Sequence, residues 1–356
     1  MLLKTSMKLR WLIFIGFAVA VFSIQLSAQE KAADEVIKVS TSLVSVPVIV
    51  TDRQGRYIPD IKREEFAILQ DGVEQKIDFF ADAEEPINIA LLIDTSNSTR
   101  LVLDDIKSAA KRMVKLLNAD DKAMIVSFDY TTHVLSPLTS DKKALEKAIK
   151  KSEIPDEIGT TLRDAVDETV RKQFADVTGR KAIIVLTDGK DHGSTITSTQ
   201  LLHSLQETDV IIYTVYFNTQ FHRRPRPDFG DRGVFGGGRR GGVFGGRIPD
   251  NERYPRFPRD ERRGDMRNQR TDRESENAKE FLRRLSDTTA GRYYESDKSK
   301  FKEVFALIVD ELRHQYRLGY YPPDESSVGK THSIRVKVMR PDLAVRARLS
   351  YRAAAK

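Results

Sequence analysis

The stretch that decides the fold runs from Asn88 to Ser98 and reads Asn-Ile-Ala-Leu-Leu-Ile-Asp-Thr-Ser-Asn-Ser. Its five consecutive apolar residues, 89–93, suit a strand that is buried on both faces, as in the middle of a parallel sheet. The run passes directly into Asp94 and a series of small polar residues. This stretch therefore predicts a central strand that ends in a polar loop.

Beyond this stretch, short apolar runs alternate with segments of helical periodicity. The predicted strands are 122–128, 133–138 (at an edge), 182–186, 210–217 and 292–295, and the predicted helices are 102–117, 141–151, 162–174, 198–207, 276–286 and 299–316. Repeated strand–helix units indicate an open, mostly parallel, doubly wound sheet. The predicted fold class is therefore α/β, and this domain is expected over residues 86–316.

Both flanks of this domain have the period of β-strands. Val44 to Val50 alternates apolar with smaller or polar residues, and Asp71-Gly72 is a hairpin turn signal. Near the C-terminus, apolar residues alternate with basic ones on either side of a turn at 340–342, and this pattern predicts a second hairpin. Neither flank can bury its apolar face alone. We therefore expect 29–85 and 317–356 to pack together as a smaller, discontinuous β-domain.

The N-terminus has the features of a secretion signal over residues 1–28. A basic start precedes the apolar run Trp11 to Phe22, and Leu26-Ser27-Ala28 places small residues before Gln29. The apolar run is shorter than the roughly 20 residues that cross a bilayer. We expect an exported protein, periplasmic or secreted, with an uncleaved N-terminal anchor as the minor alternative.

The composition limits the chemistry and locates the charge. The 356 residues include no cysteine, which excludes thiol catalysis, thiolate zinc sites and iron–sulfur clusters. The net charge is +7, but residues 221–273 contain 15 arginines, no lysine and 8 acidic residues. The basicity of the mature chain therefore belongs to one segment and not to the folded surface as a whole.

The Arg/Gly-rich segment buries too little apolar surface to offset its ordering entropy. We expect a disordered insertion over 219–275, within the α/β domain. Residues 221–273 could bind anionic envelope polymers or lipid headgroups, and a tolerated insertion without a ligand is the alternative. Nucleic acid is disfavoured as a partner because the protein is expected to be exported.

Polar side chains gather where the predicted strands end. Asp94, Ser96 and Ser98 follow the first strand, Thr160 opens a helix after Gly159, and Asp188 follows strand 182–186. Loops after parallel strands converge on one crevice at the topological switch point. Two carboxylates and three hydroxyls are hard oxygen ligands, which suit Mg²⁺ best and also Mn²⁺ or Ca²⁺.

These three stretches resemble the metal-ion-dependent adhesion site of von Willebrand factor A (VWA) domains, over about 88–316. The resemblance implies that Asp94, Ser96, Ser98, Thr160 and Asp188 bind the metal directly or through water. It also implies that a carboxylate of a protein partner completes the metal's shell. Asn97 and Ile158 stand where this family often has glycine, but neither departure removes a ligand. The flanks resemble those of exported VWA-related proteins of acidobacteria.

The function that these features favour is a non-catalytic binding or adhesion protein, and no catalytic residue is predicted. Asp129 follows strand 122–128 near the same edge and could tune the site, but we expect a surface turn there. His192, four residues beyond Asp188, could approach a ligand, but we expect a solvated loop residue. One alternative is a structural envelope protein that binds anionic polymers through the insertion. A metal-dependent hydrolase is the less favoured alternative, because the sequence offers no convincing general base beside the ion.

Overall fold

A six-stranded sheet forms the centre of the protein in the computed structural model, which describes residues 43–82, 85–219, 261–322 and 329–353. In spatial order its strands are β10 (Tyr293–Glu295), β9 (Ile211–Tyr216), β8 (Arg180–Thr187), β5 (Ile87–Asp94), β6 (Lys122–Phe128) and β7 (Thr132–Thr139). All neighbours pair in parallel except β7, which is antiparallel to β6 at the edge. The strand that the sequence places at the centre, β5, lies between β8 and β6.

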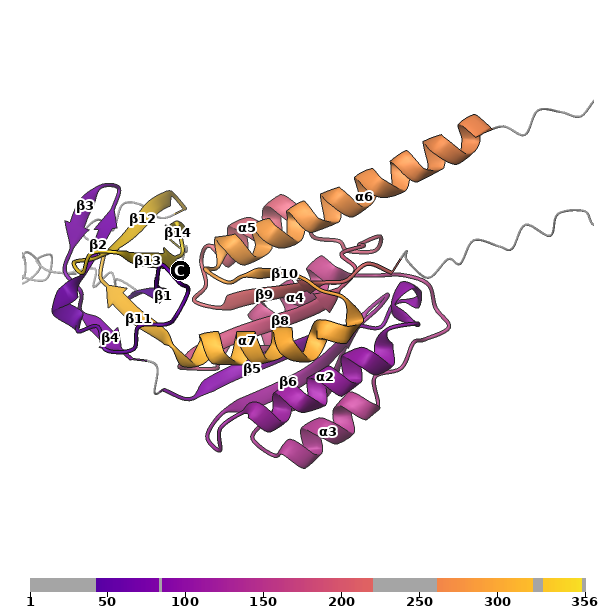
Figure 1. Ribbon diagram of the computed structural model, residues 1–356, viewed down its shortest axis with the longest axis horizontal. Coiled ribbons are helices and arrows are strands. Elements are labelled where there is room, and N and C mark those ends of the chain that lie inside the picture. Colours follow the sequence, from indigo (N-terminus) through magenta and orange to yellow (C-terminus); the bar gives the residue numbers. More distant parts are fainter. Residues whose placement is uncertain (1–42, 83–84, 220–260, 323–328, 354–356) are drawn as a thin grey trace, which may run out of the picture. The chain divides into compact units, whose positions relative to one another are not determined.

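Helices cover both faces of this sheet (Figure 1). One face packs against α2 (Leu103–Leu116), α3 (Lys142–Lys150) and α7 (Phe301–Arg313). The other packs against α4 (Leu162–Glu168), α5 (Ser198–Leu205) and α6 (Glu261–Thr288). The predicted doubly wound, mostly parallel α/β fold is confirmed. No helix among the described residues is long and apolar enough to cross a membrane.

The apolar run of β5 supplies both of these cores. Ile89, Leu91 and Ile93 point into the layer of α2, α3 and α7, whereas Ala90 and Leu92 point into the opposite layer. All five side chains are fully buried. Alternation within a continuous apolar run therefore places β5 between two hydrophobic layers, as its sequence predicts.

Two four-stranded antiparallel sheets are built from the two flanks of the chain. One has the order β13 (Leu343–Ala347), β1 (Val44–Asp52), β11 (Gln315–Tyr320), β4 (Phe79–Ala81), and the other has the order β14 (Ser350–Arg352), β12 (Thr331–Val338), β2 (Phe66–Gln70), β3 (Val73–Gln75). Each sheet mixes N-terminal and C-terminal strands, and one apolar cluster joins both sheets. The expected smaller β-structure from both ends of the chain is confirmed.

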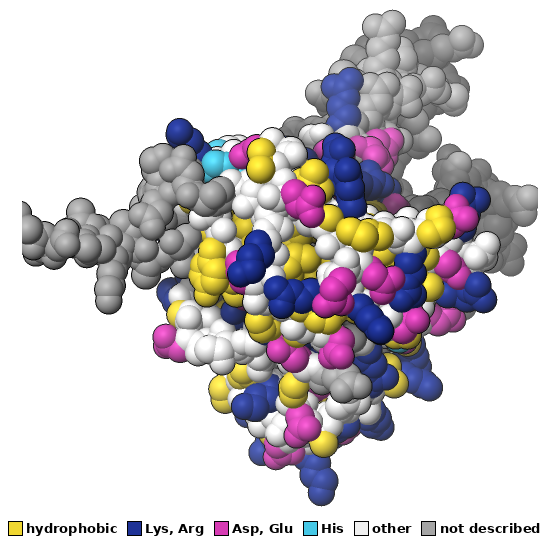
Figure 2. Space-filling view, turned by 90° about the vertical axis from the view of Figure 1, so that its left-hand side faces the viewer, with side chains coloured by type: hydrophobic (Ala, Val, Ile, Leu, Met, Phe, Trp, Pro, Cys, Tyr) yellow, Lys and Arg dark blue, Asp and Glu magenta, His cyan; other side chains and the backbone are white. Residues whose placement is uncertain are grey.

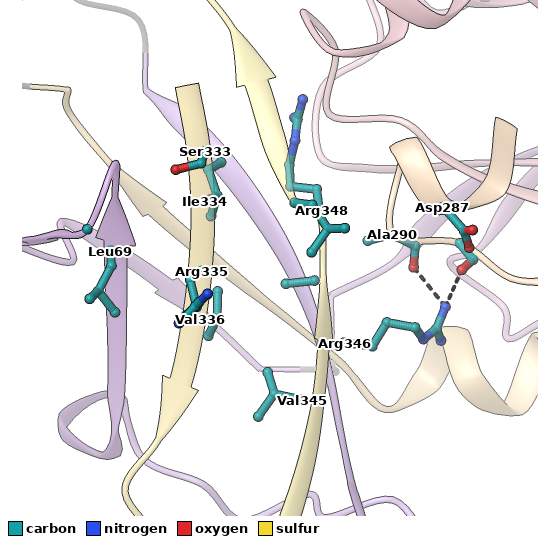
Figure 3. A pocket seen from close by; sticks show the side chains of 14 residues that line it. Leu69, Asp287, Ala290, Ser333, Ile334, Arg335, Val336, Val345, Arg346 and Arg348 are labelled. Atoms are coloured by element: carbon teal, nitrogen blue, oxygen red, sulfur yellow. Dashed lines mark hydrogen bonds between the residues drawn. The ribbon is translucent and has the colours of Figure 1, made fainter. Parts of the chain in front are cut away.

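The predicted C-terminal hairpin is wrong, because its two arms enter different sheets. β12 pairs with β2 and β14, whereas β13 pairs with β1. Both arms line an open pocket of about 610 Å³ (Figure 3). In this view Arg346 points away from Val345 and reaches the carbonyl oxygens of Ala290 and Gly291. These bonds hold β13 against the α/β unit and away from β12.

Two predicted boundaries in the last part of the α/β unit also need correction. The expected insertion 219–275 extends too far, because α6 begins at Glu261; residues 220–260 lie outside the described part of the chain. Glycine and proline are rare after position 260, and Arg, Glu and Gln favour helix there. The expected helix 299–316 ends at Arg313, because Gln315 and Tyr316 pair with β1.

A buried carboxylate at the end of α7 connects the antiparallel sheets to the α/β unit. Glu311 is fully buried and accepts a hydrogen bond from the hydroxyl of Tyr213 at 2.7 Å. Arg346 of β13 forms a salt bridge with it, and an Arg292 guanidinium nitrogen lies 3.4 Å from its second oxygen. Two cations and a hydroxyl therefore compensate the carboxylate for its lost hydration.

We expect Glu311→Gln to lower the free energy of unfolding by about 3 kcal/mol, because Arg346 would be left partly buried without its counter-charge. Urea unfolding measures this loss. Glu303→Gln, at an exposed position of the same helix, is the control and should change stability little. Equal effects of the two substitutions would contradict the role given to Glu311.

Candidate metal centre

Asp94 is the last residue of β5, and it is fully buried. Its Oδ1 accepts a hydrogen bond from the backbone N–H of Ser96 at 2.9 Å. Its Oδ2 accepts one from the hydroxyl of Thr187 at 2.6 Å, across the junction between β5 and β8. The carboxylate is therefore fixed from its own loop and from the neighbouring strand.

The loop after β5 brings two hydroxyls together. The Oγ atoms of Ser96 and Ser98 lie 3.0 Å apart. The loop is closed by Thr99, whose hydroxyl donates to the carbonyl oxygens of Asp94 at 3.0 Å and Ser96 at 2.8 Å. Adjacent ligands of an octahedral ion at about 2.1 Å are themselves about 3.0 Å apart, so this spacing fits two neighbouring ligands of Mg²⁺.

Asp188 follows β8 and is 4% exposed. Its Oδ2 accepts a hydrogen bond from the hydroxyl of Thr219 at 2.9 Å and forms a salt bridge with the ammonium of Lys190. The turn requires glycine at position 189, where φ is +74° and a Cβ would lie 2.8 Å from the Cβ of Ala278. Helix α6 therefore packs directly on the loop that carries Asp188.

The Thr160 loop is attached to the rest of the site through the loop after β6. Both the backbone N–H and the hydroxyl of Thr161 donate to the carbonyl oxygen of Asp129, at 2.7 and 3.0 Å. Gly159 lies against Tyr130, whose Cβ would be 2.8 Å from any Cβ at position 159. The absence of a side chain at Gly159 thus lets the Thr160 loop approach closely.

The expectation that Asp129 lies in a surface turn is wrong. Asp129 is 2% exposed, and its carboxylate accepts a hydrogen bond from the hydroxyl of Thr95 at 3.0 Å. Its Oδ1 lies 3.2 Å from Nε2 of His133. Asp129 binds Thr95 through its side chain and Thr161 through its backbone. It therefore connects the loop after β5 to the loop that carries Thr160. His192 is exposed, as expected, and its backbone N–H donates to the Thr160 carbonyl at 3.1 Å.

The electrostatics of this edge favour a cation. Burial, and then the neighbouring Asp188 carboxylate, raise the pKa of Asp94 from 3.8 to about 7. Two carboxylates brought together in a water-poor place repel each other, and a bound cation would reverse that effect. In the described part of the chain no three His, Cys, Asp or Glu side chains are close enough to hold an ion by themselves.

The residue set that the sequence proposes fits a hard divalent ion in its donor chemistry. Asp94, Ser96 and Ser98 share one loop, and Asp188 is near enough to Asp94 to raise its pKa. Sequence reasoning missed three side chains that contact these carboxylates: Thr187, Lys190 and Thr219. Thr187 directly precedes Asp188, and Lys190 lies two residues after it. No pattern in the sequence indicates that Thr219 contacts Asp188.

Comparison with known proteins identifies the domain that carries these loops. The family model for the von Willebrand factor type A domain matches residues 88–225, which include all five proposed ligands. The expected resemblance to VWA domains is confirmed for that range. The likeness of the three loops to the family's metal site and the acidobacterial likeness of the flanks stay predictions. No curated protein matches the chain.

Three solved structures illustrate the similarity. A von Willebrand factor type A protein from Catenulispora acidiphila is 11% identical and covers 90% of this chain and 76% of its own, with a TM-score of 0.44. Proximal thread matrix protein 1 of the mussel byssus, with a zinc-occupied MIDAS motif, is 15% identical over 67% and 48%, with a TM-score of 0.45. BatB from Bacteroides thetaiotaomicron is 18% identical over 63% and 98%, with a TM-score of 0.41.

The raised pKa of Asp94 predicts how stability depends on pH in metal-free protein. Between about pH 4 and pH 7 the native state keeps a proton that the unfolded state has lost, so stability should fall as pH rises through this window. In Asp94→Asn this fall in the free energy of unfolding should disappear, because the amide does not titrate. Urea unfolding in EDTA from pH 4 to 8 measures the difference between the two proteins. Parallel pH profiles would show that Asp94 does not titrate in this range.

Proposed function

We propose that this protein is an exported, non-catalytic binding or adhesion protein whose α/β domain holds a divalent cation, Mg²⁺ in preference to Mn²⁺ or Ca²⁺. The proposed ligands, direct or through water, are Asp94, Ser96, Ser98, Thr160 and Asp188. The observation that carries this proposal is the 3.0 Å spacing of the Ser96 and Ser98 hydroxyls beside the buried Asp94 carboxylate. The match of residues 88–225 to the VWA domain supports it.

The bound ion would supply a positive charge with a ligand position left open for an acidic group of a protein partner. The protein's other side chains hold the proposed ligands in position in the absence of the ion. Thr99 closes the serine loop, Thr187 orients Asp94, and Asp129 attaches the Thr160 loop. Such preorganisation lowers the cost of binding a partner, because little of the protein must be ordered on contact.

A binding role is favoured over hydrolysis by the state of the titratable groups around the site. A hydrolase would need a free general base within hydrogen-bond reach of the attacking water. Asp188 is paired with Lys190, and Asp129 is bonded to Thr95. His133 contacts Asp129, and His192 is exposed. Each nearby group therefore already has a structural partner or faces solvent.

Two parts of the proposal rest on residues outside the described ranges. Export is proposed from the signal-like residues 1–28, with a periplasmic or secreted location and an uncleaved anchor as the alternative. A structural envelope role through binding of anionic polymers or lipid headgroups by residues 221–273 is the second proposal from sequence, and only 261–273 of that segment falls in the described backbone.

The metal site is tested by calorimetric titration of residues 29–356 with Mg²⁺, Mn²⁺ and Ca²⁺. Wild type should bind one ion saturably, and Asp94→Ala should abolish binding because it removes the buried carboxylate at the centre of the loops. Asp120→Ala is a matched control, since Asp120 is exposed and precedes β6 at the opposite edge of the sheet. Absence of saturable binding in wild type would count against the metal site.

The role of the ion in partner binding has its own test. Once a protein partner is known, its binding should be lost in EDTA and restored by Mg²⁺. It should also be lost in Asp94→Ala with the far-ultraviolet spectrum unchanged. Partner binding that persists in EDTA would contradict a metal-dependent mode of recognition.

Lys190 should oppose metal binding, because its ammonium occupies the Asp188 carboxylate. Replacing Lys190 with Met removes this internal cation, and we expect metal affinity to rise on the order of tenfold, since one nearby charge contributes about 1–2 kcal/mol. Lys172→Met is the control, because Lys172 pairs with Glu168 on an exposed helix face. Weaker metal binding by Lys190→Met would instead mean that Lys190 supports the site.

A further inference from the structure

A basic groove lies along the outer side of α2, on the sheet face that also carries α3 and α7. Its volume is about 330 Å³. It is lined by one acidic residue, one serine and five cations: Asp104, Ser108, Lys107, Lys111, Arg112, Lys115 and Lys302. The first six belong to α2, and Lys302 comes from the first turn of α7. We refer to these seven residues as the α2 groove.

Helix α2 packs beside α7 (Figure 1), and the groove lies where side chains of the two helices meet. The two helices run in the same direction, because Lys298 approaches Asp105 at their beginnings and Arg313 approaches Asn118 at their ends. Both helices bury their apolar faces against the sheet. Their outer sides are therefore left to solvent, and Lys302 adds its charge to those of α2.

The three lysines of α2 form a regular row. Lys107, Lys111 and Lys115 are spaced four residues apart, so they lie on one side of the helix. A helix rises 1.5 Å per residue, which places successive lysines about 6 Å apart along its axis. The row thus spans about 12 Å and can meet several negative groups of a single extended chain.

Few acidic side chains accompany these cations in the described part of the chain. None of the five forms an ion pair in the part of the chain that the structure describes, although Lys107 donates to the carbonyl oxygen of Lys150 at 3.4 Å. Among the described residues, Asp104 is the only carboxylate that lines the groove. Five like charges around one groove raise the local concentration of anions and favour a ligand that carries several negative charges.

We propose that the α2 groove binds a linear polyanion, a flexible polymer with phosphate, sulfate or carboxylate groups along its chain. This role is separate from the one proposed for the metal centre and from the one proposed for residues 221–273. Four of the five cations are lysines, which act as hydrated point charges and do not select one bidentate geometry. The groove therefore recognises charge density along a chain and not one particular group.

Two other polyanionic partners fit the groove less well. Single-stranded nucleic acid is usually held by aromatic side chains that stack on its bases. None of the described residues that line the groove is aromatic. A membrane is flat on this scale, whereas the five cations surround a shallow hollow of about 330 Å³. The face of the antiparallel sheets, by contrast, shows basic and acidic side chains intermixed (Figure 2).

The test uses long-chain inorganic polyphosphate as the probe, in EDTA so that the metal centre does not take part. Residues 29–356 should bind the probe with a strong salt dependence, and orthophosphate should not compete at equal phosphate concentration. The triple variant Lys107→Gln/Lys111→Gln/Lys115→Gln should weaken binding at least about tenfold. It should also make the negative slope of log K against log[salt] less steep by about 2–3, because three fewer counterions are exchanged.

A matched control removes three charges elsewhere. Lys62, Lys330 and Lys337 are exposed residues of the antiparallel sheets and their loops, so their replacement by Gln changes net charge equally without touching the groove. This control should weaken binding less than about twofold. Thermal unfolding of both triple variants establishes that each is folded. Because the assay contains EDTA, its result is independent of whether the proposed metal site exists.

Three outcomes would overturn the proposal. Equal losses in the two triple variants would show that only net charge matters. Failure of wild type to bind polyphosphate at low salt would remove the site. Binding to phosphatidylglycerol vesicles or to single-stranded DNA that depends on the lysine row, when polyphosphate does not bind, would assign the surface to a membrane or to nucleic acid instead.

Discussion

The arrangement of the site depends on one electrostatic constraint, the burial of Asp94 beside Asp188 at the carboxyl ends of β5 and β8. A buried carboxylate must be hydrogen-bonded or paired, and a second carboxylate nearby makes this demand stronger. The neighbouring residues meet it with a backbone N–H, two threonine hydroxyls and a lysine ammonium. These contacts connect the loops after two adjacent strands and the segment after β9, so the site is ordered by the groups that compensate its carboxylates.

A second buried carboxylate plays a comparable part at the other end of the domain. Glu311 of α7 is bonded to Tyr213 of β9 and to Arg346 of β13, so one side chain joins the central sheet, a covering helix and an antiparallel sheet. Arg348 reinforces the contact, since it is 5% exposed and donates to the Thr208 carbonyl at 2.7 Å. The antiparallel sheets are thereby attached by specific polar contacts as well as by chain connectivity.

Helix α2 connects the two surfaces for which we propose ligands. Its chain enters directly from the serine loop through Thr99 and Val102, both of which are buried. Its apolar side packs on the sheet, and its outer side carries the lysine row of the α2 groove. The basic groove and the pair of carboxylates, Asp94 and Asp188, thus have opposite charge preferences. A cation is expected at one surface and an anionic chain at the other.

The sequence by itself determined the α/β class, the central position of β5 and the edge of the sheet where Asp94 and Asp188 lie. These features follow from local periodicity and from the rule that loops after parallel strands share one edge. It also indicated that strands from both ends of the chain need a common core. Such properties depend on which residues are apolar and how they are spaced, and both are visible in a single chain.

Only the tertiary structure decided the contacts between segments far apart in the chain. Asp129 reads as a turn residue but is buried, because Thr95 and Thr161 reach it from two other loops. The sequence of β12 and β13 predicts a hairpin, but the two strands separate. β12 pairs with β2, β13 pairs with β1, and Arg346 of β13 is bound by the α/β unit. Thr219 reaches Asp188, 31 residues away, for the same reason. Local pattern does not encode which distant side chain satisfies a buried polar group, and packing alone brings the partners together.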